Sequence, residues 1–250
     1  MKALLSYHWA RVWRKKSLWG VLLLVIISQL LLETQVTPTA ANPAFGAWIT
    51  QFLGPGAPSE LVAQVCYAGN QMRLGAIFLL LGSAIGGTTL CPALGINAML
   101  PVTAAGYSPR QQSRCCMILS IILCALSILA VLIGEFFLPN SVMAQMAQAQ
   151  PMLFLGLELY RFLCYLGCAG LGLLLCRLTL HAGIVLSIGA LFLTAETLPV
   201  LSHICAVLPS GSISPLLFGT APVLSMVRGI LESALILQLC FLPIGKEVTP

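Results

Sequence analysis

Long apolar runs recur along this chain, and connectors that contain proline separate them. The stretch 116–138, for example, carries a single charged residue, Glu135. Runs of about 20 apolar residues are long enough to cross the hydrocarbon core of a bilayer as a helix. Only 8% of all residues are charged and the mean hydropathy is +0.99, so the chain lacks the polar surface of an ordinary water-soluble domain. The sequence therefore predicts a membrane protein.

We predict an all-α, polytopic fold that forms one transmembrane domain over residues 1–250. Six spans are expected, at about 17–36, 72–90, 116–138, 151–176, 183–200 and 223–243. The segment 37–70 contains four prolines and no Lys or Arg, and it is expected to form an outer connector. The stretch 201–222 is apolar but interrupted by three prolines and by SGSIS, which favours a re-entrant or interfacial hairpin on the outer side before the last span.

The first sixteen residues alternate apolar and basic side chains in a helical pattern. Leu4, Leu5, Trp9, Val12 and Trp13 are expected on one face, which predicts an amphipathic helix that lies in the membrane interface. His8 in this helix is expected to be a surface residue. The alternative is a signal peptide, because a basic start, an apolar run and the small residues after Pro38 also fit that pattern.

The positive charges fall on one side of the predicted topology. Nine of the twelve Lys and Arg residues share that side: Lys2, Arg11, Arg14, Lys15, Lys16, Arg110, Arg114, Arg177 and Lys246. The positive-inside rule then places both termini in the cytoplasm. Beyond the first helix no basic run is interleaved with aromatic residues, so nucleic acid is not an expected partner.

Motifs for catalysis are absent from the sequence. The chain contains no Asp, and HExxH, GxSxG, CxxC and the phosphate-binding GxxxxGK[ST] do not occur. We therefore expect no enzymatic activity, metal or cofactor in this chain, and any ATP that drives it is expected on another polypeptide. An intramembrane hydrolase stays possible only where residues distant in sequence converge.

Two pairs of opposite charges lie inside predicted spans. Glu158 and Arg161 are spaced i, i+3, and Arg228 and Glu232 are spaced i, i+4, so each pair can neutralise itself on one helix face. We expect intramembrane ion pairs, with direct substrate contact as the alternative. In the second span, Gly82 and Gly86 have the small-xxx-small spacing that lets helix backbones approach closely.

Two segments resemble the membrane-spanning subunits of ABC exporters of the second class, the ABC-2 type permeases. The opening MKALLSYHWARVWRKKSLW looks like the start of that family, and LPVTAAGYSPRQQSR resembles the cytoplasmic stretch before its third span. The resemblance implies a permease domain over the whole chain in a bacterial cytoplasmic membrane. It also implies a separate ABC ATPase subunit that binds ATP and a second permease subunit, either a copy or a different chain. The size is similar to that of permeases in lantibiotic and bacteriocin immunity.

The mechanism that the resemblance implies transmits force from the ATPase to the cytoplasmic ends of the spans. Five residues are then candidates for the coupling surface: Asn97, Met99, Arg110, Arg114 and Arg177. The substrate implied is a peptide antibiotic or another amphipathic molecule taken from the bilayer or from a cleft between two subunits. A non-catalytic membrane scaffold is the main alternative, and a secondary transporter is a further one.

Overall fold

The computed structural model describes four long helices, one short N-terminal helix and one short buried segment. The described residues are 2–14, 59–90, 105–137, 151–179, 207–213 and 222–242, with isolated positions between these ranges. Their elements are α1 (Lys2–Trp13), α4 (Ser59–Thr89), α6 (Pro109–Phe137), α8 (Pro151–Thr179), the 3-10 turn η1 (Pro209–Ser212) and α12 (Pro222–Phe241). The described residues contain no strand, as expected for an all-α fold.

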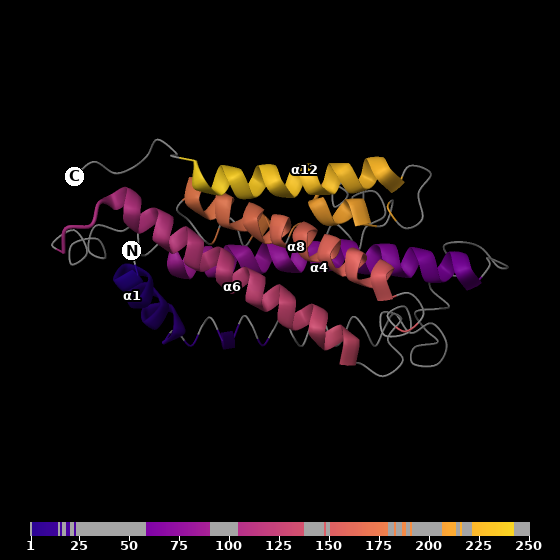
Figure 1. Ribbon diagram of the computed structural model, residues 1–250, viewed down its shortest axis with the longest axis horizontal. Coiled ribbons are helices and arrows are strands. Elements are labelled where there is room, and N and C mark those ends of the chain that lie inside the picture. The colour runs from indigo at the N-terminus through magenta and orange to yellow at the C-terminus, as the bar shows by residue number, and fades with distance from the viewer. Residues whose placement is uncertain are drawn as a thin grey trace.

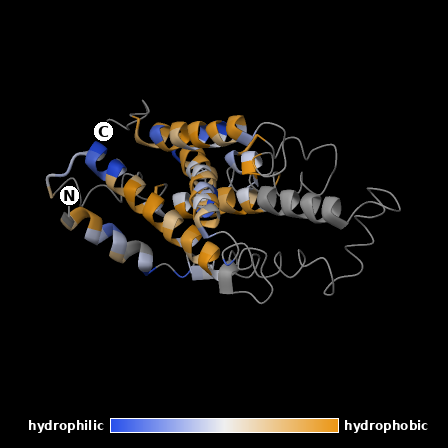
Figure 2. Cartoon of the chain, turned by 45° about the vertical axis from the view of Figure 1, so that its right-hand side comes forward, coloured by the Kyte–Doolittle hydropathy of each residue, from blue (hydrophilic) through white to orange (hydrophobic). Residues whose placement is uncertain are grey.

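Three of these helices are long and apolar enough to cross a bilayer. The candidate spans are Arg110–Gly134, Phe154–Thr179 and Pro222–Phe241, and Leu74–Thr89 within α4 is a shorter apolar helix. Figure 2 shows these helices as predominantly hydrophobic, with the polar start of α6 as the clearest exception. Length and composition therefore mark a membrane protein. The predicted spans 17–36 and 183–200 lie outside the described residues, apart from a few isolated positions, so the number six stays a prediction.

Two helices begin earlier than the sequence predicted. α4 starts at Ser59, so the expected outer connector 37–70 is wrong for its last twelve residues. The dense prolines that favoured a connector end at Pro58, and the residues that follow are compatible with a helix. α6 starts at Pro109 rather than 116, because Ser108 caps it. The Gln111 amide donates to Ser108 Oγ (3.3 Å) and the Ser108 amide donates to Gln111 Oε1 (3.0 Å), which is a capping box with proline at the first helical position.

Helix α8 lies at the centre of the bundle and contacts α4, α6, α12 and η1 (Figure 1). Glycine allows close approaches of α8 to two neighbouring helices. Gly82 of α4 lies against the Ala169 backbone, and a Cβ built on Gly82 would stand only 2.7 Å from the Ala169 carbonyl carbon. A Cβ on Gly167 would stand 3.0 Å from the Cα of Ser233 on α12. Helices in a membrane associate by such close packing, because lipid supplies no hydrophobic force between them.

Several hydroxyl groups in the helices are satisfied within the bundle, as a medium without water favours. Ser83 donates to the Leu79 carbonyl (2.8 Å) and Ser127 donates to the Leu123 carbonyl (2.7 Å), each one turn back in its own helix. Thr89 and Ser120 share a hydrogen bond of 2.6 Å that joins α4 to α6. Because these hydroxyl groups are hydrogen-bonded, burying them between helices costs little free energy.

The order of contacts along the helices gives their direction. α4, α8 and α12 run the same way and α6 runs against them. α1 and the last turn of α12 lie at the end where α6 begins (Figure 1). Because α8 and α12 are parallel, the chain must return between them. The predicted span 183–200, most of which lies outside the described residues, would supply that return.

Candidate functional site

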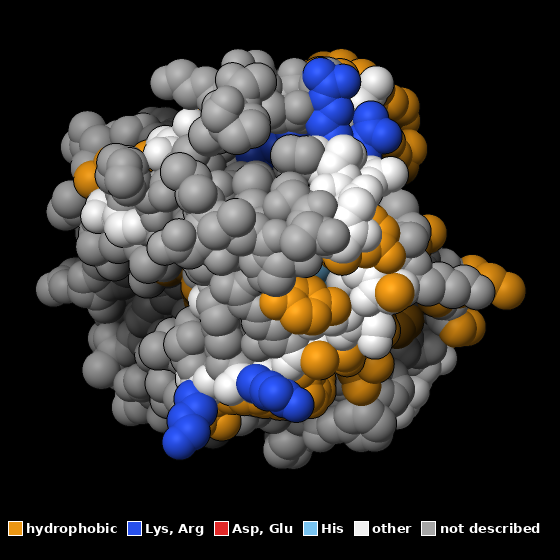
Figure 3. Space-filling view, turned by 90° about the vertical axis from the view of Figure 1, so that its left-hand side faces the viewer, with side chains coloured by type: hydrophobic (Ala, Val, Ile, Leu, Met, Phe, Trp, Pro, Cys, Tyr) orange, Lys and Arg blue, Asp and Glu red, His pale blue; other side chains and the backbone are white. Residues whose placement is uncertain are grey.

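Cationic side chains gather at the end of the bundle that holds α1 and the start of α6. Figure 3 shows Lys and Arg side chains there, and no carboxylate of the described residues is visible in that view. Arg110 and Arg114, in the first turns of α6, are exposed. Arg177 lies in the last turn of α8, where its Nη1 donates to the Cys240 carbonyl at 2.5 Å and so ties α8 to the end of α12.

The five predicted coupling residues therefore divide into two groups. The structure brings Arg110, Arg114 and Arg177 to the same end of the bundle. Asn97 and Met99 lie outside the described residues. Arg177 has a structural role that the sequence did not indicate, because its partner is a backbone carbonyl 63 residues away.

Helix α1 packs on the start of α6 through a face that the sequence did not predict. Leu4 and His8 are buried, at 3% and 2% exposure, and His8 Nδ1 lies 3.7 Å from Cys116 Sγ on α6. The expectation that His8 is a surface residue is wrong. Trp9 and Trp13 are exposed instead of sharing a face with Leu4, because they lie about 140° and about 180° around the helix axis from Leu4.

The pair Glu158–Arg161 lies in the interior of the bundle. Arg161 Nη1 is 2.6 Å from Glu158 Oε1, and the exposed fractions of the two side chains are 1% and 15%. The guanidinium also lies 5.7 Å from the ring centroid of Tyr165, within the range of a cation–π contact. A charge that is buried to this degree needs such partners, because leaving it unpaired lowers the free energy of unfolding by about 3–5 kcal/mol.

The pair Arg228–Glu232 lies on the outside of α12. Arg228 Nε is 2.7 Å from Glu232 Oε1, and the exposed fractions are 45% and 33%. Arg228 is six residues after the start of the helix, so its long side chain can extend toward the polar boundary of the membrane. Both predicted ion pairs are formed, in two different environments.

Residues 208–213, around η1, are buried between α4, α8 and α12. Tyr160 on α8 shares a hydrogen bond of 2.6 Å with Ser212 and donates to the Ser225 carbonyl at 3.1 Å. Tyr160 lies nine residues after Pro151, about 14 Å along the helix, so this junction is well inside the bundle. Gly229 on α12 has room for no side chain, since a Cβ there would overlap Tyr160 and Ser212. We call these contacts the hydroxyl junction.

The sequence indicated this junction only in part. The SGSIS segment predicted a break before the last span, and the structure places it in the interior, but the hairpin itself extends beyond the described residues. Tyr160 was not selected, because a tyrosine in an apolar run carries no spacing that would reveal a partner 52 residues away.

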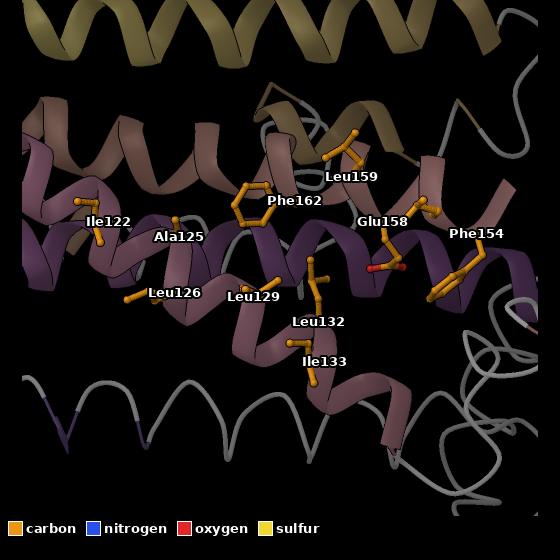
Figure 4. A pocket seen from close by; sticks show the side chains of 11 residues that line it. Ile122, Ala125, Leu126, Leu129, Leu132, Ile133, Phe154, Glu158, Leu159 and Phe162 are labelled. Atoms are coloured by element: carbon orange, nitrogen blue, oxygen red, sulfur yellow. The ribbon is translucent and has the colours of Figure 1, made fainter. Parts of the chain in front are cut away.

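A groove of about 680 Å³ runs between α6 and α8. Its walls are apolar apart from one carboxylate, that of Glu158, which points between the two helices (Figure 4). Its lining consists of Ile122, Ala125, Leu126, Leu129, Leu132, Ile133, Phe154, Leu155, Glu158, Leu159 and Phe162. Such a space fits an apolar body with one polar group, which is the usual character of a small-molecule site.

The residues that the structure describes hold no candidate metal centre. They contain no group of three or more His, Cys, Asp or Glu side chains that could hold a metal ion. No protein-family model, curated protein or solved structure matches this chain.

Proposed function

We propose that this chain is the membrane-spanning permease subunit of an ATP-driven exporter of the ABC-2 type. In this proposal it is a multi-pass protein of a bacterial cytoplasmic membrane, with both termini in the cytoplasm, and ATP is hydrolysed on a separate ATPase subunit. The observation that supports it best is the grouping of α1, the exposed Arg110 and Arg114, and the end of α8 at one end of the bundle. That end offers a cationic surface for a partner to press against.

Force applied at this end would reach the rest of the bundle through α8. α8 contacts α4, α6, α12 and η1, and Arg177 fastens its last turn to α12. A central helix that is packed this tightly moves with its neighbours, which is how small displacements at one site become rearrangements of a whole bundle. In this proposal the 3-10 turn η1, which interrupts the helical packing between α4, α8 and α12, is where the backbone changes its arrangement.

The groove between α6 and α8 suggests the class of substrate. Its apolar lining, with the polar Glu158–Arg161 pair at its edge, suits an amphipathic molecule such as a peptide antibiotic. This agrees with a role in lantibiotic or bacteriocin immunity. A second permease subunit, either identical or different, would complete the transporter.

The test is to purify the tagged chain from its native host and ask what accompanies it. We expect an ABC ATPase subunit to co-purify, and we expect Arg110→Glu with Arg114→Glu to reduce its recovery about ten-fold or more, because two contacts change from attractive to repulsive. Arg228→Gln is the matched control, since Arg228 lies on α12 away from this end, and it should leave recovery unchanged.

Recovery without any ATPase subunit would overturn the proposal. A stable complex with other proteins and no transport of any substrate would favour a membrane scaffold. Both outcomes are read from the same preparation, by identifying the co-purified chains and by measuring export from vesicles that contain them.

A secondary transporter is the second candidate, and the hydroxyl junction favours it. Irregular backbone that is buried between helices is typical of the sites at which transporters hold ions and substrates. The distinguishing measurement is uptake into proteoliposomes that contain this chain alone. Transport that follows an ion gradient in the absence of ATP would select this candidate over the exporter.

A further inference from the structure

Three tryptophans form a continuous aromatic surface next to helix α1. The rings of Trp9 and Trp13 are stacked, with centroids 5.3 Å apart and planes inclined by 15°. Trp19 meets Trp13 edge-on at 4.6 Å, and its Nε1 donates to the Trp13 carbonyl at 3.1 Å. We call Trp9, Trp13 and Trp19 the tryptophan ladder. Its internal contacts hold the rings in a defined arrangement.

The ladder faces away from the helix bundle. The opposite side of α1, which carries Leu4 and His8, is buried against α6. The exposed fractions of the three tryptophans are 36%, 44% and 45%, and the neighbouring Tyr7 is 47% exposed. Exposed apolar patches of this kind mark sites that contact a membrane or another protein.

Cationic side chains accompany the ladder without any acidic residue. Arg14 and Lys16 are exposed beside it. The first 32 residues contain five Lys and Arg residues and no Asp or Glu, so nothing in this segment neutralises them. The segment therefore presents indole rings and positive charge together.

We infer that the tryptophan ladder, with Arg14 and Lys16, binds the anionic headgroups of membrane phospholipids such as phosphatidylglycerol. Indole rings settle at headgroup depth, where the ring is buried and the N–H stays near water. Lys and Arg beside them attract the phosphates of anionic lipid. This surface is independent of the exporter proposal, since it requires neither ATP nor a transported substrate.

The experiment uses the full chain, purified and reconstituted into phosphatidylcholine vesicles, with Trp48→Phe so that only the ladder tryptophans fluoresce. Brominated phosphatidylglycerol and brominated phosphatidylcholine are compared as quenchers at equal fractions. We expect stronger quenching by the anionic lipid, and we expect Arg14→Gln and Lys16→Gln each to lower that preference roughly five-fold. Raising the salt concentration should lower it as well.

Arg228→Gln removes the same charge from α12 and is the matched control, which should leave the lipid preference unchanged. The thermal midpoint of each variant, read from circular dichroism, checks that α1 stays folded on α6. Equal quenching by the two lipids would overturn the inference, as would a preference that survives Arg14→Gln with Lys16→Gln. Tryptophans that neither lipid quenches would mean that a protein covers the ladder, and this result would also overturn it.

Discussion

At the scale of single residues, the two ion pairs show what sequence spacing can and cannot reveal. The i, i+3 and i, i+4 spacings predict that Glu158 meets Arg161 and that Arg228 meets Glu232. They cannot tell that Arg161 is 1% exposed while Arg228 is 45% exposed. That difference depends on which side of each helix its neighbours cover, and the neighbours are distant in sequence. For the same reason, the sequence could not predict the partners of Tyr160 and His8, which lie on other elements.

A double-mutant cycle measures the consequence for Arg161. We expect Glu158→Gln to lower the free energy of unfolding by about 3–5 kcal/mol, because the buried guanidinium loses its counter-charge. Adding Arg161→Met should recover much of that loss, because an apolar side chain replaces the charge. The measurement is unfolding of the purified chain by SDS in mixed micelles.

The exposed pair supplies the comparison for this cycle. Glu232→Gln should cost no more than about 1 kcal/mol, since Arg228 can reach the polar boundary of the membrane without it. Effects of Glu158→Gln and Arg161→Met that simply add would show that the two side chains are not coupled.

At the scale of elements, the crossing of α4 and α8 depends on glycine from both helices. The spacing of Gly82 and Gly86 predicted close helix packing, and the structure supplies the partner, since Gly82 meets Ala169 and Gly86 meets Leu173 and Cys176. The sequence alone could not choose that partner from several apolar helices. The sequence also predicts a start of α4 that is thirteen residues too late. The proline-rich and glycine-rich composition favours a connector up to residue 70, but the prolines end before Ser59, where α4 begins.

Gly82→Ala tests this crossing with one added methyl group. The new Cβ would overlap the Ala169 backbone, which has no flexible end to move aside, so we expect a loss of about 1–3 kcal/mol in the free energy of unfolding. Gly156→Ala in α8 is the control, because nothing lies within 4 Å of its Cβ position. A loss of equal size in both variants would mean that helix propensity or the detergent, and not the crossing, sets the stability.

At the scale of the whole molecule, the described helices constrain the path of the chain. α1 lies at the end where α6 begins and where α4, α8 and α12 finish (Figure 1). One crossing is therefore needed between α1 and α4 and another between α8 and α12. The predicted spans 17–36 and 183–200 occupy those intervals. They would supply the two crossings, and the number of six spans stays a prediction. The apolar pattern could not give the packing order that makes α8 central.

Reporter fusions test this topology in cells. We expect a C-terminal fluorescent protein to mature, because the positive-inside rule places that end in the cytoplasm. Alkaline phosphatase fused at Gln148, between α6 and α8, should be active, because that position lies at the opposite end. Phosphatase activity at the C-terminus instead would reverse the orientation, and activity at both positions would contradict the shared direction of α8 and α12.

The enclosure of residues 208–213 has a consequence for how the protein is made. These residues pack against α4, α8 and α12, and α12 is the last of the three helices to be synthesised. Until that helix enters the membrane, the serines of η1 have a wall missing and face lipid. We therefore expect a chain that stalls before residue 222 to leave these serines uncovered, and to be more readily degraded by membrane proteases than a chain that includes α12.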